Sequence, residues 1–409
     1  MKTLIRLVPN RSLNQRWLLQ SVRLAWIGAA MLTGCPASNG SSTEQAGGDL
    51  GDDDPYEYAA YCEDEVVSRF NCSDAPKPDT IFRFSQLGIN ISTVPVIAVD
   101  DEFLYVSLAD LEDPEAGGTF RLAKDGSNFT KLSGDRFDQL LVVGDRLFAY
   151  SNSGFWSAAA AGLWSMRKDG TDLKEHKLLK STEWHSEEYE VSAGNLILGE
   201  DGRIFIGGNV FCARDKPTQI LAFDPATETT TEIATDTCIR TFAVDAGYVY
   251  WAQSDYAAHA ERLRRAPIGG GPATTLATAP GEWRWSGLAI AGAKLYAMVS
   301  DGVGSDETVE MELDGTELTC FAPAGVGSVD QTREGVIARL SAIHSPDCVL
   351  QIGNGRITVV GNASTSGFGL YSKLAINSEF VYSAGADDIE RLPFPAQDPD
   401  SDLPMTLPR

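Results

Sequence analysis

The sequence predicts an all-β protein built from repeated units of four antiparallel strands, and three observations lead to this prediction. The chain of 409 residues has 39 glycines and six methionines, a composition that favours strands and turns over helices. An apolar strand, a tight turn and a second apolar-aromatic strand recur along the chain, as in residues 97–105 and 242–250. A second hairpin follows each copy. Four strands per repeat correspond to one blade of a β-propeller, which is the predicted fold.

The number of repeats predicts the number of blades. Clear copies of the first hairpin begin near residues 97, 242, 288 and 374, looser copies near 140 and 196, and a degenerate copy near Val329. We therefore expect one propeller over residues 80–409 with seven blades. Six blades are the alternative if the degenerate copy near Val329 does not form a blade.

The second hairpins have Asp-Gly turns, at Asp125-Gly126, Asp169-Gly170 and Asp314-Gly315. Type I′ turns need positive φ, which glycine adopts without steric cost. We therefore expect type I′ turns at these three positions.

The N-terminus has the pattern of a secretory signal. Residues 1–34 contain five basic and no acidic residues, a short apolar run at 24–31, and then Leu32-Thr33-Gly34-Cys35. The run is much shorter than the ~20 residues that span a bilayer as a helix. Leu-Thr-Gly-Cys resembles the bacterial lipobox, which implies that Cys35 is acylated and becomes the first residue of the mature chain. An ordinary signal peptide with a chance cysteine is the alternative.

Charge limits the partners that the mature chain can have. Cleavage before Cys35 removes five positive charges and changes the formal net charge from −24 to −29. A chain this acidic repels phosphates and anionic headgroups. We therefore expect no nucleic-acid partner, and membrane contact through the lipid only. Residues 35–55 are predicted to be a flexible acidic tether. Pro36 stands where some Gram-negative lipoproteins carry a retention Asp, which by that resemblance implies the outer membrane.

The cysteine count agrees with an extracytoplasmic location. Without Cys35, six of the seven cysteines remain, an even number that is typical of oxidising compartments. Other pairings stay open, but the preferred disulfides join sequential neighbours: Cys62–Cys72, Cys212–Cys238 and Cys320–Cys348. The first pair would cross-link residues 56–79, which we expect to form a small cap that precedes the propeller.

The fourth repeat carries a family resemblance. Tyr250-Trp251-Ala252-Gln253, followed by Arg264–Gly270, resembles blades of YWTD-type and Tol-associated β-propellers, and also blades of predicted bacterial propeller lipoproteins. The resemblance covers about residues 80–409 and implies the fold. Gln253 replaces the Asp of the YWTD pattern, so receptor-type ligand binding is not implied.

Strand order predicts a functional face. In each blade, the loop between strands two and three and the connection to the next blade emerge on one face, which we call the long-loop face. Five loops between strands two and three are long: Ser107–Thr119, Ser151–Gly162, Asn209–Thr218, Gln253–Glu261 and Ser300–Thr308. Long loops on a rigid scaffold are common places for binding residues.

The aromatic and histidine side chains of this face form the candidate binding surface: Trp156, Trp184, His185, Tyr256, His259, Trp283 and Trp285. Acidic residues accompany them: Asp110, Glu112, Asp113, Glu115, Glu187 and Glu188. Aromatic rings flanked by carboxylates suit a sugar or a cationic peptide. In the alternative interpretation, Trp283 and Trp285 wedge between blades and the acids are a solvated rim.

Known catalytic motifs are absent from the sequence. The four histidines lack metal-ligand spacing, and no nucleophile elbow, phosphate loop or dinucleotide fingerprint occurs. We therefore expect no metal and no cofactor, and interpret the chain as a monomeric, non-catalytic binding or scaffolding module for a protein, peptide or glycan at the cell envelope. The alternative is a carbohydrate-active hydrolase or lyase with its site in the central depression, because the fold and not sequence spacing brings catalytic carboxylates together.

Overall fold

In a computed structural model the chain divides into two compact units, Met1–Asp54 and Pro55–Arg409. The structure describes residues 75–394 of the second unit, except for 90, 92–94, 111–112, 114, 152–161, 177, 179–194, 209–216, 256–257, 259, 280–282, 301–305, 323–325, 333–334, 341–347, 354–355, 363–372 and 386. The predicted signal peptide, Cys35, the tether and the Cys62–Cys72 bridge lie outside the described residues.

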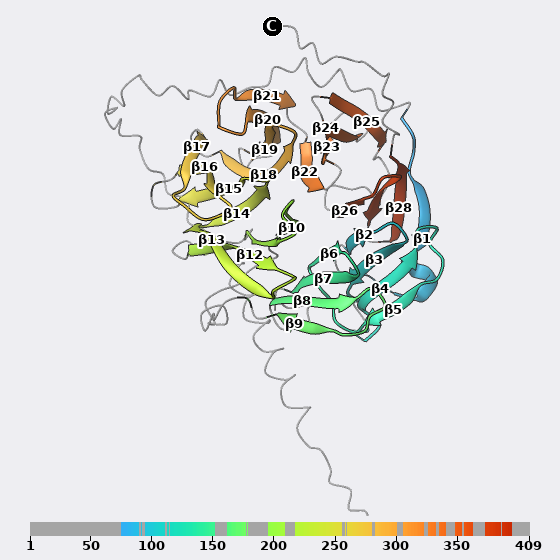
Figure 1. Ribbon diagram of the computed structural model, residues 1–409. Helices are drawn as coiled ribbons and strands as arrows, with labels where there is room; N and C mark the ends of the chain where they lie inside the picture. The colour runs from blue at the N-terminus through green and yellow to red at the C-terminus, as the bar shows by residue number, and fades with distance from the viewer. Residues whose placement is uncertain are drawn as a thin grey trace, which may run out of the picture. The chain divides into compact units, whose positions relative to one another are not determined.

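The described residues form seven four-stranded antiparallel sheets and one short 3-10 helix, η2 (Phe84–Leu87) (Figure 1). Blade one contains β2 (Val96–Val99), β3 (Phe103–Leu108), β4 (Gly118–Ala123) and β5 (Thr130–Ser133). Blade two contains β6 (Gln139–Val143), β7 (Arg146–Ser151), β8 (Gly162–Arg167) and β9 (Lys174–His176). Blade three contains β10 (Asn195–Leu198), β11 (Ile204–Gly207), β12 (Pro217–Asp224) and β13 (Thr229–Thr237). Blade four contains β14 (Ile239–Val244), β15 (Tyr248–Asp255), β16 (Ala260–Pro267) and β17 (Thr274–Ala279).

The last three blades complete the set. Blade five contains β18 (Arg284–Ala291), β19 (Lys294–Ser300), β20 (Asp306–Glu312) and β21 (Thr319–Ala322). Blade six contains β22 (Val326–Thr332), β23 (Gly335–Leu340), β24 (Cys348–Gly353) and β25 (Arg356–Asn362). Blade seven contains β26 (Lys373–Ile376), β27 (Phe380–Ala384), β28 (Asp388–Pro393) and β1 (Asp79–Arg83). The predicted all-β propeller is confirmed, and its sheet count agrees with seven blades, because the degenerate repeat near Val329 forms blade six.

The first strands of the blades surround a common centre (Figure 1). In chain order, β2, β6, β10, β14, β18, β22 and β26 each contact the next, and β26 contacts β2. The seven sheets therefore form a closed ring in which each blade contacts both of its neighbours.

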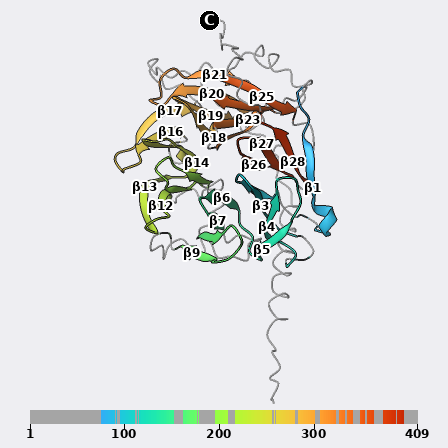
Figure 2. The same ribbon diagram turned by 45° about the vertical axis from the view of Figure 1, so that its right-hand side comes forward.

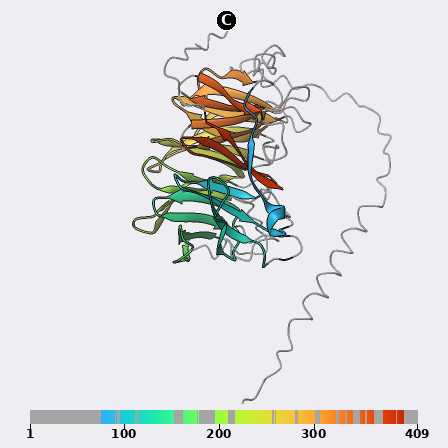
Figure 3. The same cartoon turned by 90° about the vertical axis from the view of Figure 1, so that its right-hand side faces the viewer.

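The ring is closed by the beginning of the described chain. β1 pairs antiparallel with β28, with Asp79 opposite Arg391 and Arg83 opposite Asp388. Figures 2 and 3 show β1, in blue, beside the red β28. The sequence analysis did not predict this strand, because Asp79–Arg83 belongs to no hairpin of its own.

Most of the core lies between neighbouring blades. Side chains alternate between the two faces of a strand, so β15 places Trp251 in the cluster between blades three and four, and Tyr250 and Ala252 in the cluster between blades four and five. Trp285 lies in the latter cluster and is only 2% exposed. The fold thus buries its largest side chains where blades meet.

The Asp-Gly turns differ from the sequence prediction. Gly126 has a φ of +84°, but Asp125 does not have positive φ, whereas type I′ geometry needs positive φ at both central residues. Instead, Asp125 Oδ1 accepts hydrogen bonds from the backbone N (2.9 Å) and Oγ (2.6 Å) of Ser127. The same side-chain bonds close the turns at Asp169 and Asp314. The type I′ prediction is wrong because the aspartate of each Asp-Gly pair accepts these bonds without positive φ, and of the two residues only glycine takes the left-handed conformation.

Candidate functional site

The strand bounds distinguish the two faces of the propeller. On one face, the connections are short, such as 100–102, 144–145, 245–247 and 292–293. On the other face, the long-loop face, they include 109–117, 152–161, 177–194, 208–216 and 363–372. The predicted loops Gln253–Glu261 and Ser300–Thr308 are shorter than expected, because the strands extend into them and leave connections of only 256–259 and 301–305. The other lengths agree with the predicted asymmetry and direct attention to the long-loop face.

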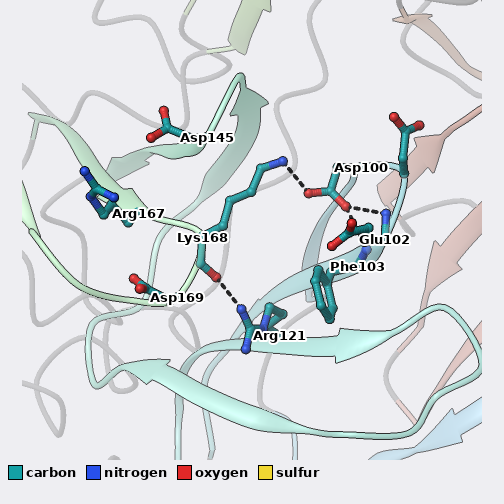
Figure 4. A pocket seen from close by; sticks show the side chains of 9 residues that line it. Asp100, Glu102, Phe103, Arg121, Asp145, Arg167, Lys168 and Asp169 are labelled. Atoms are coloured by element: carbon teal, nitrogen blue, oxygen red, sulfur yellow. Dashed lines mark hydrogen bonds and ion pairs between the residues drawn. The ribbon is translucent and has the colours of Figure 1, made fainter.

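The opposite, short-turn face holds a pocket of about 460 Å³ between blades one and two (Figure 4). Its lining is charged: Asp100, Asp101, Glu102, Phe103, Arg121, Asp145, Arg167, Lys168 and Asp169. Lys168 Nζ lies 2.6 Å from Asp100 Oδ2, and Arg121 Nη1 donates a hydrogen bond of 3.0 Å to the Lys168 carbonyl.

Contacts in this pocket recur at other blade interfaces. An arginine of the third strand donates to a carbonyl in the turn of the next blade in three places: Arg121 to Lys168, Arg265 to Leu313 and Arg391 to Lys124. In each case the guanidinium also lies over an aromatic ring of its own blade, at 4.6 to 4.8 Å from the ring centroid. We call this arrangement the inter-blade arginine clamp. Because it repeats around the ring, we assign the Arg121–Lys168 contact to structure.

The long-loop face carries a polar cluster where blades four and five meet. We call it the blade 4–5 cluster; its members are Arg240, Ser254, Glu261 and Arg284. Ser254 is the last residue but one of β15, and Glu261 is opposite it in β16. Arg240 belongs to β14, Arg284 is the first residue of β18, and these two innermost strands are neighbours. Strand register therefore pairs Ser254 with Glu261, and contact between β14 and β18 places the strands of Arg240 and Arg284 side by side.

A chain of hydrogen bonds joins three of these residues. Arg240 Nε donates to Ser254 Oγ (2.5 Å), and Ser254 Oγ donates to Glu261 Oε2 (2.7 Å). Arg240 Nη2 lies 3.8 Å from Glu261 Oε1, which is an ion pair but too long for a hydrogen bond. Ser254 is fully buried, and the Glu261 side chain is 12% exposed.

Burial alters the acidity of the carboxyl group in this cluster. Desolvation raises the pKa of Glu261 above its ordinary value, while the Ser254 hydrogen bond and the charges of Arg240 and Arg284 act in the opposite direction. A carboxyl group with a raised pKa beside a hydroxyl and guanidinium groups is suited to proton transfer or to charge-dependent ligand binding.

A disulfide-bonded cysteine is hydrogen-bonded to the blade 4–5 cluster. Cys238 directly precedes β14, is disulfide-bonded and is 1% exposed, and its carbonyl accepts a hydrogen bond from Ser254 N (3.0 Å). Cys320 is also disulfide-bonded. The structure does not describe the side chains of Cys212 and Cys348, so the pairings Cys212–Cys238 and Cys320–Cys348 stay predictions.

The predicted binding residues have different places in the structure. Five of them lie outside the described residues: Trp156, Trp184, His185, Tyr256 and His259. Trp283 is half-buried against the core between blades four and five. Trp285 is buried in that core, so its ring has almost no surface for a ligand, as the wedge interpretation expects.

The predicted acidic residues also have different places in the structure. Glu112, Glu187 and Glu188 lie outside the described residues, and Asp113 and Glu115 are exposed. Asp110 is buried, and its Oδ1 accepts a hydrogen bond from Asp113 N (2.8 Å), which is a structural role in the connection.

The sequence analysis missed the members of the blade 4–5 cluster. Glu261 appeared there only as the end of a predicted loop, and no motif marks Arg240 or Arg284. The usable signal was that Glu261 lies near the start of the third strand of its blade, which places it at the long-loop face.

The part of the chain that is described contains neither a metal site nor a membrane-spanning helix. No group of three or more His, Cys, Asp and Glu side chains in the described residues is placed to hold a metal ion. No helix among these residues is long and apolar enough to cross a membrane.

Comparisons with known proteins support the fold and leave the function open. No family model matches the sequence, and no curated protein matches it. An oligogalacturonate lyase structure from Vibrio parahaemolyticus is 11% identical, with 79% of this chain and 95% of that chain covered and a TM-score of 0.50. A putative TolB from Agrobacterium tumefaciens is 13% identical over 61% of this chain and 90% of that one, with a TM-score of 0.38. A nidogen/laminin complex is 14% identical over 56% and 80%, with a TM-score of 0.36. At this identity, the likeness to the lyase shows the propeller fold alone.

Proposed function

We propose that this protein is a lipid-anchored propeller of the cell envelope that binds a protein, peptide or glycan on its long-loop face without catalysis. The observation that carries the proposal is the difference between the two faces. Hydrogen-bonded turns close the short-turn face, whereas the strands that flank the long connections 152–161 and 177–194 end on the other. Long connections on a rigid ring can present varied side chains at little cost to stability.

The proposed anchor rests on the N-terminal sequence. The basic region, the short apolar run and Leu32-Thr33-Gly34-Cys35 support an acylated Cys35 followed by a tether that leads to the propeller. Cells labelled with a fatty-acid probe test this part. We expect the wild-type chain to carry label in the membrane fraction, and a Cys35→Ala variant to lose the label. A Cys35→Ala chain that keeps its label would contradict the anchor.

The binding function is tested with glycan and peptide arrays and the mature chain. A variant in which a Gly-Ser linker replaces residues 179–194 removes Trp184 and His185 while the strands of blades two and three remain. A matched control changes the short-turn face instead, with Asp101→Asn and Glu102→Gln. We expect the linker variant to lose array binding and the control to keep it. Loss in the control alone would move the binding surface to the short-turn face.

A second candidate function is carbohydrate cleavage, and the raised pKa of Glu261 is the observation that favours it. A carboxyl group whose pKa is raised by burial is better suited to act as a general acid than an ordinary one. A hydrolysis and elimination screen with wild type and Glu261→Gln tests this candidate. Turnover by wild type that the variant loses would establish the enzyme, and no turnover by wild type would favour the binding module.

A further inference from the structure

A serine and a histidine form a buried hydrogen bond in blade two. Ser165 Oγ of β8 lies 2.7 Å from His176 Nε2, at the end of β9. Ser165 is fully buried and His176 is 7% exposed. A serine beside an imidazole resembles the nucleophile and base of a hydrolase, but a substrate cannot reach a buried hydroxyl. The pair therefore acts on the fold itself and not on a substrate.

The hydrogen bonds of Ser165 determine which nitrogen of the imidazole carries a proton. A hydroxyl group has one hydrogen and two lone pairs. Arg146 donates to Ser165 Oγ twice, from Nε (3.2 Å) and from Nη2 (3.0 Å), and these two bonds use both lone pairs. The hydroxyl hydrogen is left for His176 Nε2, which can accept it only when it has no proton of its own. Neutral His176 therefore has its proton on Nδ1.

β9 is attached to blade three at two points. The His176 ring packs against Phe223 of β12, with 4.8 Å between the ring centroids. Lys174 Nζ lies 2.5 Å from Glu228 Oε2, in the turn that follows β12. Within blade two, β9 has only three residues, which pair with the residues 163–165 of β8. A strand this short depends on its contacts with the neighbouring blade.

A proton on Nε2 is incompatible with the hydrogen bond to Ser165. The new N–H group would point at an oxygen whose lone pairs already accept from Arg146, and the hydroxyl hydrogen would lose its acceptor. Two cations would then lie against one hydroxyl group. Arg146 cannot readily move away, because its Nη1 also donates to Asp172 Oδ2 (2.6 Å). The protonated imidazole must therefore leave Ser165.

The surrounding charges also favour the neutral ring. The charged groups that act on it are Arg146 of β7, Lys174 of β9 and Glu228 of the turn between β12 and β13. β8 and β12 place the uncharged side chains of Ser165 and Phe223 against it. Burial lowers the pKa of His176, and the two cations act in the same direction. Glu228 opposes them, but its carboxylate is already paired with Lys174.

We propose that Ser165 and His176 form an acid-sensitive latch between blades two and three. Neutral His176 accepts from Ser165 and holds β9 against Phe223, whereas protonated His176 leaves Ser165 and releases β9. Release exposes the edge of β8, and an exposed edge can pair with another strand. This inference concerns the joint between two blades and goes beyond the proposed binding function.

Nitrogen NMR of the mature chain with labelled histidines tests the direction of the hydrogen bond. At pH 8 the His176 ring should carry a proton on Nδ1 and none on Nε2, and its titration midpoint should lie below the ordinary value of 6.5. The signal is assigned through the contacts of the ring with Phe148 and Phe223, so no variant is needed. A neutral ring with its proton on Nε2, or a midpoint at or above 6.5, would overturn the proposal.

Hydrogen exchange of the backbone amides measures the release of β9. After correction for the intrinsic effect of pH on exchange, protection of β9 should fall about tenfold or more between pH 7.5 and pH 5. β5, the outermost strand of blade one, contains no histidine and should keep its protection. Equal protection of β9 at both pH values would mean that no latch opens.

Variants assign the effect to His176. His176→Gln keeps an acceptor for the Ser165 hydroxyl and cannot be protonated, so β9 should stay protected at pH 5. His344→Gln changes a histidine between β23 and β24 and should lose protection of β9 as wild type does. Loss of protection in His176→Gln at pH 5 would assign the effect to another group and overturn the proposal. If His176→Gln does not fold, the nitrogen spectrum and the exchange of wild type still decide.

Discussion

Arg121 of blade one holds blade two through a backbone carbonyl: its Nη1 donates a 3.0 Å hydrogen bond to the carbonyl of Lys168. The same guanidinium lies 4.6 Å from the centroid of the Phe103 ring. Since the acceptor is a carbonyl, this contact does not depend on the side chain at position 168, and the clamp that contains Leu313 in place of a lysine has the same form.

The inter-blade arginine clamps predict a measurable loss of stability. Arg121→Ala, Arg265→Ala and Arg391→Ala should each lower the free energy of unfolding by about 1–3 kcal/mol, because each removes a charged hydrogen bond and a cation–π contact. The three clamps lie at different interfaces, so their effects should add. Urea unfolding measures the losses. Arg167→Ala, which removes no clamp, is the control, and an equal loss in that variant would contradict the assignment.

Gly126 is predicted to tolerate no side chain. Its φ is +84°, and a Cβ atom there would lie 1.9 Å from the carbonyl oxygen of Ile81 in β1. Gly144 also has positive φ, +60°, but a Cβ at that position meets nothing within 4 Å. Gly144→Ala should therefore cost only the backbone strain of about 1–2 kcal/mol, and Gly126→Ala should cost clearly more. Equal unfolding midpoints for the two variants would show that the turn does not pack against β1 as described.

His176 should make stability depend on pH. It is 7% exposed, its Nε2 lies 2.7 Å from Ser165 Oγ, and burial lowers its pKa below the ordinary value of 6.5. The unfolded chain therefore takes up a proton at a pH at which the folded chain does not. The free energy of unfolding should fall as pH decreases below about 6.5, by at most about 1.4 kcal/mol per pH unit from this group.

The control for this pH effect is His176→Gln. Urea unfolding of both proteins between pH 5 and pH 8 should show a steeper decline for wild type on the acidic side. Parallel curves would mean that His176 has the same pKa in the folded and the unfolded chain.

Ring closure by β1 predicts that residues before η2 are part of the fold. A chain that begins at Phe84 lacks β1 and leaves β28 as an open edge, so it should unfold at lower urea and associate through that edge. A chain that begins at residue 75 keeps β1 and should remain monomeric and stable. Size-exclusion chromatography with urea unfolding measures both properties. Identical behaviour of the two chains would contradict a structural role for β1.

The sequence predicted those features that repeat locally. A hairpin is formed by residues close in the chain, so the pattern around Ala98 or Ala243 marked two strands and a turn wherever it occurred. β1 has no such partner nearby: Asp79 pairs with Arg391, and nothing in its own sequence identifies that strand.

The candidate site was less predictable because it depends on which side chains share a blade interface. Aromatic residues on the predicted long-loop face were readily found, but burial decides their role, and Trp285 is buried. Conversely, Arg240 and Glu261 belong to different strands, and only the register of β14, β15 and β16 brings them together. Sequence spacing contains no information on that register.

The pairing of β1 with β28 also has a consequence for the order in which the protein can fold. During synthesis, Asp79–Arg83 emerges before the other described strands, and its partner Asp388–Pro393 emerges after them. Contacts between distant parts of a chain form slowly, because the entropy cost of closing a long loop comes before the stabilisation that the contacts provide. Six blades can therefore assemble on a growing chain, but the seventh must wait for the final hairpin. A chain that stops short of residue 388 keeps the unpaired strands of an unfinished ring, and such edges are the kind of surface that chaperones and proteases meet in incomplete proteins.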